Sequence, residues 1–245
     1  MIDIHCHLLP GIDDGAVDLD DALAMARIAV DDGITHAVVT PHIHPGRWEN
    51  AAQGIASAAR DFSARLREHG IPLIIGHAAE VRLTDQLFQQ LEEESIPFLG
   101  EVDGYQVMLL EFPHNQVLPG SEKLTAWLLR NGIRPLLAHP ERNKEIMVAP
   151  GRLKPFIDQG CMIQVTAGAL VGRFGARAME AARYFLANGQ VDLIASDGHN
   201  TKARRPELSE AAAYITEKYG EAEAQKLARE TPWRLVGAQF QANTK

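Results

Sequence analysis

Two histidines lie one residue apart at the end of the first apolar stretch of the chain, and two aspartates follow a short turn later. His5 and His7 end a run that reads as a buried strand, and Asp13 and Asp14 come after the turn Pro10-Gly11. Imidazole nitrogens and carboxylate oxygens are ligands of divalent first-row metal ions. This segment therefore predicts part of a metal site, in which either aspartate could serve as a ligand.

The same side-chain chemistry recurs later in the chain, each time near the end of an apolar run that predicts a strand. The whole set comprises His5, His7, His42, Glu80, Glu111, His139, Asp197 and His199. A structural zinc site uses four ligands in a closed tetrahedron. Eight or nine such side chains instead predict two or three ions with shared carboxylates and open positions for water, an arrangement suited to hydrolysis of a phosphate ester or an amide.

The remaining histidines have simpler interpretations. His36 reads as a strand histidine with satisfied hydrogen bonds, and His69 and His114 read as solvated loop residues. His44 and His77 lie beside predicted ligands but are not included in the ligand set. We therefore expect these five histidines to bind no metal.

The two cysteines, Cys6 and Cys161, both lie in apolar runs that predict strands. Cys6 lies between two predicted ligands, so we expect no structural disulfide and a reducing, cytoplasmic location. A nucleophilic phosphatase cysteine would be followed by a glycine-rich phosphate loop ending in arginine, whereas Cys6 is followed by His7-Leu8-Leu9-Pro10. We expect the Cys6 thiol to fill space in the core.

Composition narrows the class of protein. The 245 residues include 24 Lys and Arg against 32 Asp and Glu, a net charge of -8, which disfavours nucleic-acid or anionic-membrane partners. Hydrophobic residues at 46% and charged residues at 23% are typical of a soluble globular protein. No apolar run approaches the ~18 residues that span a bilayer, and we expect no signal segment before the first strand. These features predict one cytoplasmic domain over residues 1–245, without membrane insertion.

Seven predicted strands alternate with helical segments. The strands are the run around Ile2 and Ile4, followed by 35–40, 73–75, 106–111, 135–138, 161–165 and 191–195, with loops at 41–47 and through 97 and 100. The helices are one capped by Asp18 or Asp20 and ending near Gly33, then 51–68, 84–93, 121–131, 153–159 and 177–188. Two or three closing helices follow over 206–218 and 221–238, before a polar tail.

This alternation predicts an α/β fold with a parallel sheet covered on both faces. In such a fold, ligand-binding residues gather at the carboxyl ends of the strands. The first strand is not followed by a glycine-rich dinucleotide-binding fingerprint. We therefore predict a barrel of seven strand-helix units, distorted or incomplete, rather than a doubly wound sheet.

At this point the sequence resembles a known family. It resembles the polymerase-and-histidinol-phosphatase (PHP) superfamily through a series of motifs in the same order. These motifs are His5-x-His7, Thr40-Pro41-His42, Glu80, His139-Pro140-Glu141-Arg142 and Asp197-x-His199. More narrowly, the chain resembles the bacterial manganese-dependent protein-tyrosine phosphatases of capsule and exopolysaccharide loci (the CpsB/CapC/YwqE-like family). The segments that carry this resemblance are Met1 to His7, Asp13-Asp14-Gly15, Glu111-Phe112, His139 to Asn143 and Ala195 to Asn200. This resemblance extends from residue 1 to about residue 236.

The resemblance implies the PHP fold, which is a distorted seven-stranded (β/α)7 TIM-like barrel, and a trinuclear site. Manganese is the expected metal, with zinc, iron and magnesium as alternatives. One ion would be held by His5, His7, Glu80 and Asp197; a second by Glu80, Glu111 and His139; and the third by Asp14, His42 and His199. A hydroxide bridging two ions would attack phosphorus directly, with no phosphocysteine intermediate.

Phosphate oxygens also need cationic partners from the protein. Arg142 lies three residues after His139 and is the first candidate. Arg204 and Arg205 lie in the loop after the last strand, where the family has one arginine before a proline; the loop length differs here by about one residue, so both stay candidates. Arg47 is a further candidate for binding substrate.

The implied substrate is the phosphotyrosine-rich tail of a membrane-anchored bacterial tyrosine autokinase. Trp48 or Phe112 could flank the aromatic ring of the phosphotyrosine. The resemblance is compatible with a monomer and with a homo-oligomeric ring. The nearest alternative is a PHP phosphoesterase acting on histidinol phosphate or a nucleotide. An amidohydrolase-like enzyme is disfavoured because no lysine ends a predicted strand, and the complete ligand set disfavours a non-catalytic binding module.

Overall fold

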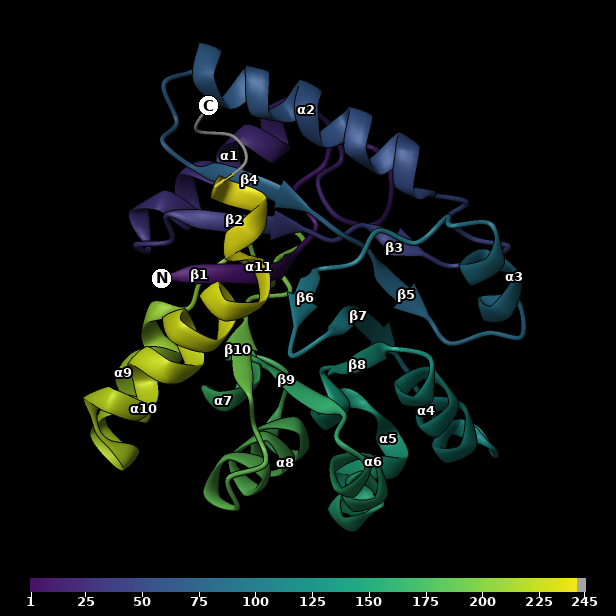
Figure 1. The fold of residues 1–245 in the computed structure, drawn as a ribbon. Coiled ribbons are helices and arrows are strands. Elements are labelled where there is room, and N and C mark those ends of the chain that lie inside the picture. The colour runs from purple at the N-terminus through teal and green to yellow at the C-terminus, as the bar shows by residue number, and fades with distance from the viewer. Residues whose placement is uncertain (242–245) are drawn as a thin grey trace.

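Parallel strands form two sheets around a common centre (Figure 1). The structure, a computed structural model, describes residues 1–241. The first sheet has the order β1-β2-β4, with β1 (Ile2–Cys6), β2 (His36–Val39) and β4 (Ile74–His77). The second has the order β10-β9-β8-β7-β5-β3, with β3 (His42–Ile43), β5 (Glu80–Arg82), β7 (Tyr105–Glu111), β8 (Ile133–Ala138), β9 (Met162–Thr166) and β10 (Leu193–Ala195).

Two chain segments pass from the first sheet to the second after a short break. β2 continues into β3 after residues 40–41, and β4 continues into β5 after residues 78–79. The Ala78 N–H donates to the Val39 carbonyl at 2.9 Å, so the two segments stay paired through the break. The expectation that residues 41–47 form only a loop is therefore wrong, because β3 lies within them.

Hydrogen bonds join the last strand to the first. The Asp197 N–H donates to the His5 carbonyl at 2.8 Å, and the His7 N–H donates to the Gly198 carbonyl at 2.9 Å. The seven strand units in order around the centre are β1, β2–β3, β4–β5, β7, β8, β9 and β10. This arrangement confirms the predicted distorted seven-stranded α/β barrel.

An antiparallel hairpin extends the second sheet. β6 (Gly100–Val102) pairs with β7, and the turn between them places Asp103 at φ 53° and Gly104 at φ 78°. An Asp-Gly pair is a strong signal for such a two-residue hairpin turn, because both residues must adopt positive φ. The prediction of a loop through residues 97 and 100 missed this signal.

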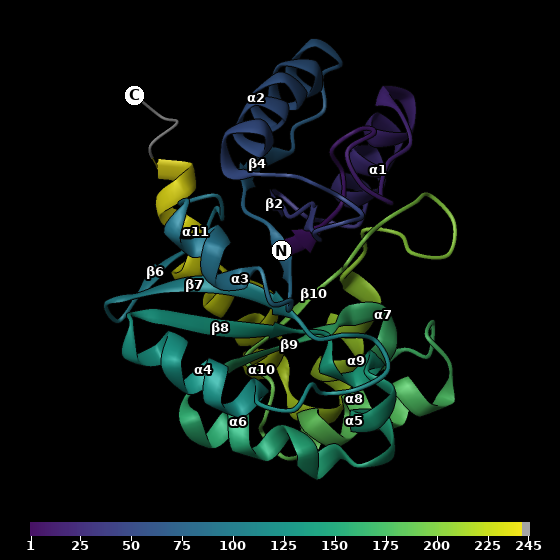
Figure 2. The same ribbon diagram turned by 90° about the vertical axis from the view of Figure 1, so that its right-hand side faces the viewer.

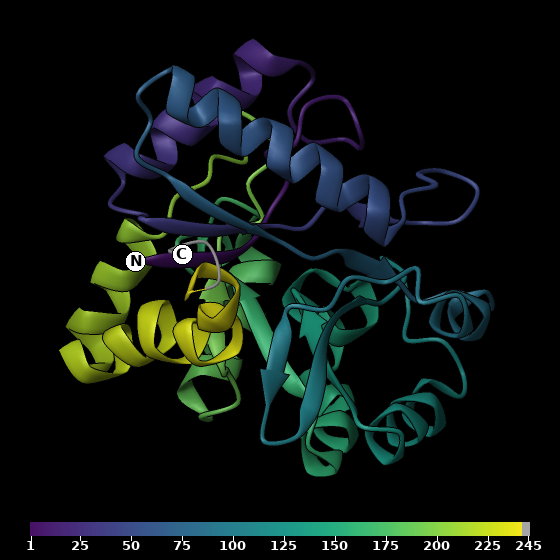
Figure 3. The ribbon, with the colours of Figure 1, turned by 45° about the horizontal axis from the view of Figure 1, so that its top comes forward.

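Helices surround the strands (Figures 2 and 3). They are α1 (Leu19–Asp31), α2 (Ala52–Glu68), α3 (Leu87–Glu92), α4 (Ser121–Arg130), α5 (Lys144–Val148), α6 (Lys154–Gln159), α7 (Ala167–Leu170), α8 (Ala176–Ala187), α9 (Ser209–Tyr219), α10 (Glu221–Gln225) and α11 (Thr231–Gln241), with single turns η1 (Pro140–Arg142), η2 (Pro150–Leu153) and η3 (Lys226–Glu230). Asp18 is the N-cap of α1, since its side chain accepts from the Asp21 N–H at 2.9 Å. The short elements α5, α7, η1 and η2 were not predicted. The segment 221–238 forms α10, η3 and the greater part of α11, in agreement with the larger of the two predicted numbers of closing helices.

Alternate residues of the strands face two apolar cores. Val107 and Leu109 lie in the barrel interior with Leu235 and Phe240 of α11, whereas Met108 belongs to the core between strands and outer helices. The helix α11 therefore packs against the amino-terminal half of the barrel. It does not cover the carboxyl ends of the strands. The predicted polar tail begins inside α11, and residues 242–245 lie outside the described part of the chain. Within residues 1–241, no helix combines the length and apolar character needed to cross a membrane.

Candidate metal centre

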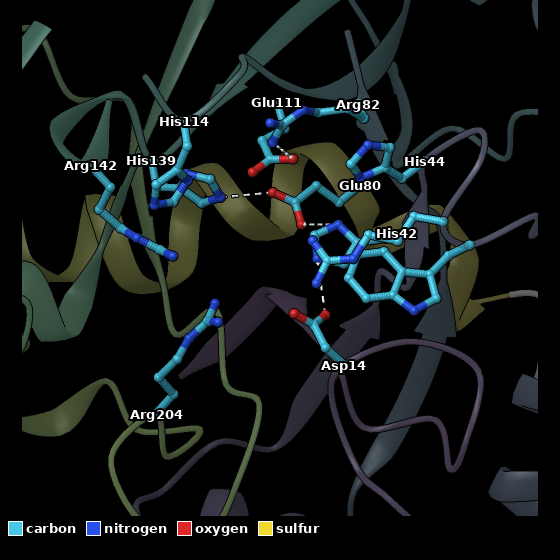
Figure 4. Close-up of a pocket in the computed structure, with 12 residues that line it drawn as sticks. Asp14, His42, His44, Glu80, Arg82, Glu111, His114, His139, Arg142 and Arg204 are labelled. Carbon is cyan, nitrogen blue, oxygen red and sulfur yellow. Dashed lines mark hydrogen bonds and ion pairs between the residues drawn. The ribbon is translucent and has the colours of Figure 1, made fainter. Parts of the chain in front are cut away.

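The carboxyl ends of the strands and the loops after them bring the predicted metal ligands together. Figure 4 shows those that line the pocket: Asp14, His42, Glu80, Glu111 and His139. Strand residues provide His5, His42, Glu80 and Glu111, and the following segments provide His7, Asp14, His139, Asp197 and His199. All of these side chains are buried except Asp14, which is 40% exposed. Their role as ligands stays a prediction, but the geometry that it requires is present.

The deepest cluster joins His5, His7, Glu80 and Asp197. Each histidine Nε2 lies 3.3–3.4 Å from Glu80 Oε2 and from Asp197 Oδ1, and the two Nε2 atoms are 3.3 Å apart. A tetrahedron with such edges has its centre about 2.0–2.1 Å from each corner, the usual distance from zinc to nitrogen or oxygen. These four donors therefore fit one divalent ion.

Three of the cluster histidines have their second ring nitrogen engaged by the protein. The acceptors are Gln164 Oε1 for His5 Nδ1 at 2.9 Å, Asp13 Oδ2 for His7 Nδ1 at 2.7 Å, and the Asp197 carbonyl for His199 Nδ1 at 2.9 Å. Each acceptor favours the tautomer with the proton on Nδ1, which leaves the Nε2 lone pair free for a metal. The histidines are thus oriented as metal ligands by hydrogen bonds to their second ring nitrogens.

A second group consists of His7, Asp14, His42 and His199. Asp14 Oδ1 lies 3.2 Å from His42 Nε2 and 3.5 Å from His199 Nε2. Asp13 instead contacts the other side of the His7 ring and accepts from the Gly15 N–H at 2.9 Å. The fold therefore gives the two adjacent aspartates different positions, with Asp14 at the candidate ion and Asp13 behind His7.

Glu80 connects the clusters. Its Oε1 lies 2.7 Å from His139 Nε2, and its Oε2 lies 2.9 Å from His42 Nδ1. Glu111 is grouped with His42 and Glu80, and its Oε2 pairs with Arg82 Nη1 at 2.6 Å. The resemblance placed His139 beside Glu111 on one ion, whereas here His139 contacts Glu80 and the group around Glu111 contains His42.

Several donor atoms of these clusters are buried without a hydrogen bond of normal geometry among the described residues. They are Glu80 Oε2, Asp197 Oδ1 and His199 Nε2. Burying an unpaired carboxylate oxygen is costly, and buried charges are normally paired or coordinate metal ions. The donor set and its unpaired atoms therefore fit divalent cations.

Electrostatics in the cluster favour ionised carboxylates. Although burial opposes ionisation, His5 and His42 hold the pKa of Glu80 well below its usual range, and Arg204 and Arg142 do the same for Asp197. Burial and the adjacent His7 lower the pKa of His199 to about 4, which keeps its imidazole neutral and able to bind a metal near pH 7.

The backbone is unusual at two predicted ligands. Among the described residues, four that are not glycine have positive φ, and two of these are His139 at φ 33° and Asp197 at φ 49°. Positive φ is unfavourable for residues with a Cβ and is found preferentially at functional sites. The next residue, Gly198, has no room for a side chain, because a Cβ there would lie 2.7 Å from Pro206.

Three of the predicted arginines line the same pocket, which has a volume of about 290 Å³. Arg142 and Arg204 both donate to Asp197 Oδ2, Arg204 at 2.6 Å, and Arg47 lies on the ring of Trp48. Arg205 instead pairs with Glu207 at 2.8 Å. The geometry therefore favours Arg204 over Arg205 as the second phosphate-binding arginine.

The pocket includes residues that the sequence did not indicate. Arg82 and His114 line it, and so does His44, which was excluded from the ligand set. Arg82 could have been found from strand alternation, since it lies two residues after Glu80 and side chains at that spacing share a face of a strand. His114 is exposed, as expected for a loop residue, and no sequence signal indicated its position at the pocket.

The two aromatic candidates are already packed. The Trp48 ring stacks on His42 with centroids 4.8 Å apart and an interplanar angle of 11°, and Arg47 lies 4.1 Å from its centroid. Phe112 is 6% exposed and packs against Phe156. Trp48 therefore orients His42, and Phe112 belongs to the core.

Cys6 is fully buried, and its thiol donates to the Val38 carbonyl at 3.5 Å. Burial raises the pKa of Cys6 well above its usual value, so the reactive thiolate is disfavoured. This placement agrees with the interpretation of Cys6 as a core residue.

Comparison with known proteins assigns the family. The family of capsular polysaccharide synthesis proteins CpsB/CapC matches residues 1–237. The chain belongs to the CpsB/CapC family. The match extends over all seven strand units, so this CpsB/CapC member includes every segment that contributes to the candidate site.

Similar proteins include phosphatases. Tyrosine-protein phosphatase YwqE of Bacillus subtilis is 35% identical over 220 residues, which are 90% of this CpsB/CapC member and 85% of YwqE. Tyrosine-protein phosphatase CpsB of Streptococcus pneumoniae is 29% identical over 245 residues, covering 96% of this chain and 98% of CpsB. A chain from the crystal structures of B. subtilis YwqE and S. pneumoniae CpsB, described as unique metal-dependent tyrosine phosphatases, has a TM-score of 0.84 and 33% identity, covering 98% of this chain and 93% of that one.

More distant structures share the fold alone. The lactonase Lmo2620 of Listeria monocytogenes has a TM-score of 0.54 and 15% identity, covering 96% of this chain and 94% of its own. Barrel hydrolases with different chemistry thus share the arrangement of strands, and the ligand set must be argued from this chain's own residues.

Proposed function

We propose that this CpsB/CapC family member is a metal-dependent protein-tyrosine phosphatase. The observation that carries the proposal is a set of buried carboxylate and imidazole atoms that lack hydrogen bonds of normal geometry, next to a pocket that arginines line. The phosphatases YwqE and CpsB support the same activity for this chain. Bound divalent ions would supply hydroxide near neutral pH and stabilise negative charge on the phosphoryl group.

We further propose that three ions, manganese before zinc, iron or magnesium, occupy the clusters. The proposed ligands are His5, His7, Asp14, His42, Glu80, Glu111, His139, Asp197 and His199. The buried carboxylates of Glu80, Glu111 and Asp197 provide about half of the negative charge that three divalent cations require. Asp14 is the most exposed ligand, so its ion would be the one that exchanges most readily with solvent.

The arginines have a separate role in this proposal. Arg142 and Arg204 bind phosphate oxygens through their planar guanidinium groups, and Arg47 binds the substrate beside Trp48. No protein side chain needs to form a bond to phosphorus, because Cys6 is buried away from the pocket.

The proposed physiological substrate is a phosphotyrosine segment of a membrane-anchored bacterial tyrosine autokinase, dephosphorylated in the cytoplasm by a single domain spanning residues 1–245. The assignment to capsular polysaccharide synthesis supports this class of partner. The exposed pocket would accept a phosphotyrosine side chain that extends from a peptide.

Hydrolysis of a phosphotyrosine peptide by metal-stripped protein tests the proposal. We expect manganese to restore turnover in the wild type and in Cys6→Ser, and to fail in His139→Ala. An intact peptide with manganese, zinc and magnesium would refute the tyrosine-phosphatase assignment. Histidinol phosphate and nucleotides would then be the next substrates to test.

A further inference from the structure

Two arginines from different loops lie on one aromatic ring. Arg142 belongs to η1, Arg204 lies in the loop after β10, and Phe174 lies in the loop after α7. The guanidinium carbon of Arg142 is 4.5 Å from the Phe174 ring centroid, and that of Arg204 is 6.0 Å from it. Both distances lie within about 6 Å, the range of cation–π attraction.

The position of Phe174 is fixed by its surroundings. Gly168 of α7 lies beside the ring, where a Cβ would come within 3.2 Å of Phe174 Cε2. The Arg173 N–H donates to the Gly168 carbonyl at 2.9 Å, and the Arg173 guanidinium pairs with Glu207 at 2.6 Å and Glu210 at 2.8 Å. The loop is therefore attached both to α7 and to the start of α9.

The ring differs from the other partner that the two arginines share. Both donate to Asp197 Oδ2, while Asp197 Oδ1 faces His5 and His7. A carboxylate neutralises a guanidinium and competes with phosphate for it. An aromatic face attracts the guanidinium cation but offers no hydrogen-bond acceptor in the guanidinium plane. The guanidinium N–H groups therefore stay available to phosphate oxygens.

We propose that Phe174 is a positioning residue that holds Arg142 and Arg204 with their N–H groups directed at the phosphoryl group. The inference rests on the proposed function, because it assumes that these arginines bind phosphate. Removing the aromatic face should weaken phosphate binding about 3- to 10-fold, given the usual strength of partly exposed cation–π pairs.

Calorimetric titration of inorganic phosphate into the manganese-loaded protein tests this role. We expect Phe174→Leu, which keeps an apolar side chain, to bind phosphate 3- to 10-fold more weakly. Phe174→Tyr, which keeps the aromatic face, should bind like the wild type. The control is Phe88→Leu, which removes an exposed aromatic residue of α3 that packs on Trp127. Bound manganese and the melting temperature are measured for each variant.

Three results would overturn the inference: unchanged phosphate affinity in Phe174→Leu, loss of manganese from that variant, or equal weakening in Phe174→Tyr. A wild-type protein that binds no phosphate would also overturn it. Peptide hydrolysis is measured in parallel, because a wild type that binds phosphate but leaves phosphotyrosine peptide intact contradicts the proposed function and not the role of Phe174.

Discussion

A single carboxylate behind His7 sets the direction of that imidazole. Asp13 Oδ2 lies 2.7 Å from His7 Nδ1 and also accepts from the His42 N–H at 3.1 Å. It thus contacts two predicted ligands and faces no candidate ion. Such supporting carboxylates fix the tautomer and raise the basicity of a metal-binding histidine.

Substituting Asp13 by alanine should therefore weaken manganese binding about 10- to 100-fold without removing a ligand. Calorimetric titration of metal-stripped protein would measure the change. Asp20→Ala, an exposed residue in the first turn of α1, is the matched control and should bind manganese normally. Equal affinity in the two variants would contradict the role assigned to Asp13.

Both thiols should be unreactive in the folded protein. Cys6 is 0% exposed and Cys161 is 5% exposed, and burial raises the pKa of Cys161 to about 12. A chromogenic disulfide reagent should label both only at the rate of unfolding, and urea should accelerate labelling strongly. Rapid labelling of either thiol in the native protein would show that its burial is wrong.

Residue types and spacing were enough to predict which side chains share the pocket, because ligands that end parallel strands must meet at one end of a barrel. They could not distinguish Asp13 from Asp14, since adjacent residues differ only in where the loop turns them. They also missed Arg82, although its spacing of two residues from Glu80 places both side chains on one face of β5.

The loop after β1 depends on one close backbone contact. A Cβ on Gly15 would lie 2.1 Å from the His7 carbonyl oxygen, and the Ala16 N–H donates to that carbonyl at 3.1 Å. The loop that carries Asp13 and Asp14 therefore packs directly on the end of the strand.

Gly15→Ala should destabilise the protein by about 1–3 kcal/mol and reduce its manganese content, because the loop must move away from His7. Chemical denaturation and elemental analysis would measure the two effects. A variant with normal stability and a full metal complement would show that the contact can relax.

Gly54→Ala is the opposite case. This glycine lies in the first turn of α2, and a Cβ there would meet no atom within 4 Å. Alanine should stabilise the protein by about 0.5–1 kcal/mol, because glycine loses more backbone entropy in a helix. Urea denaturation would detect the gain, and a loss of stability would contradict it.

The long elements followed from apolar periodicity, but the short strands did not. β3 has two residues and β5 has three, too few to show an alternating pattern. Their existence depends on pairing with neighbours across the breaks in the chain. The hairpin of β6 and β7 is different, because the pair Asp103-Gly104 is a local signal for a hairpin turn. Only helices and parallel strands were predicted from the sequence, so this signal was not used.

Metal removal should destabilise the whole barrel. Glu80 comes from β5 and Asp197 follows β10, and both carboxylates are fully buried against histidines of β1 and its loop. Without cations these charges repel each other inside the protein. A chelator should lower the melting temperature, and added manganese should restore it.

Differential scanning fluorimetry would measure this shift, with His139→Ala as a variant expected to show a smaller one because it lacks a proposed ligand. An unchanged melting temperature on chelation would contradict the presence of ions in the clusters. The alternation of strands and helices was sufficient to predict the barrel that this experiment probes. The positions of the two chain breaks that distort the barrel were not visible in the sequence.

The pairing of the first strand with the last also has a consequence for biosynthesis. Asp3 accepts a hydrogen bond from the backbone of Ser196, 193 residues later. The segment after Ser196 provides two of the candidate ligands, Asp197 and His199. A ribosome must therefore translate most of the message before the nascent chain can enclose a complete metal pocket. Contacts between such distant residues also slow folding, because a long loop must close first. The newly made chain would thus expose its unpaired strand edges to chaperones until its final quarter emerges.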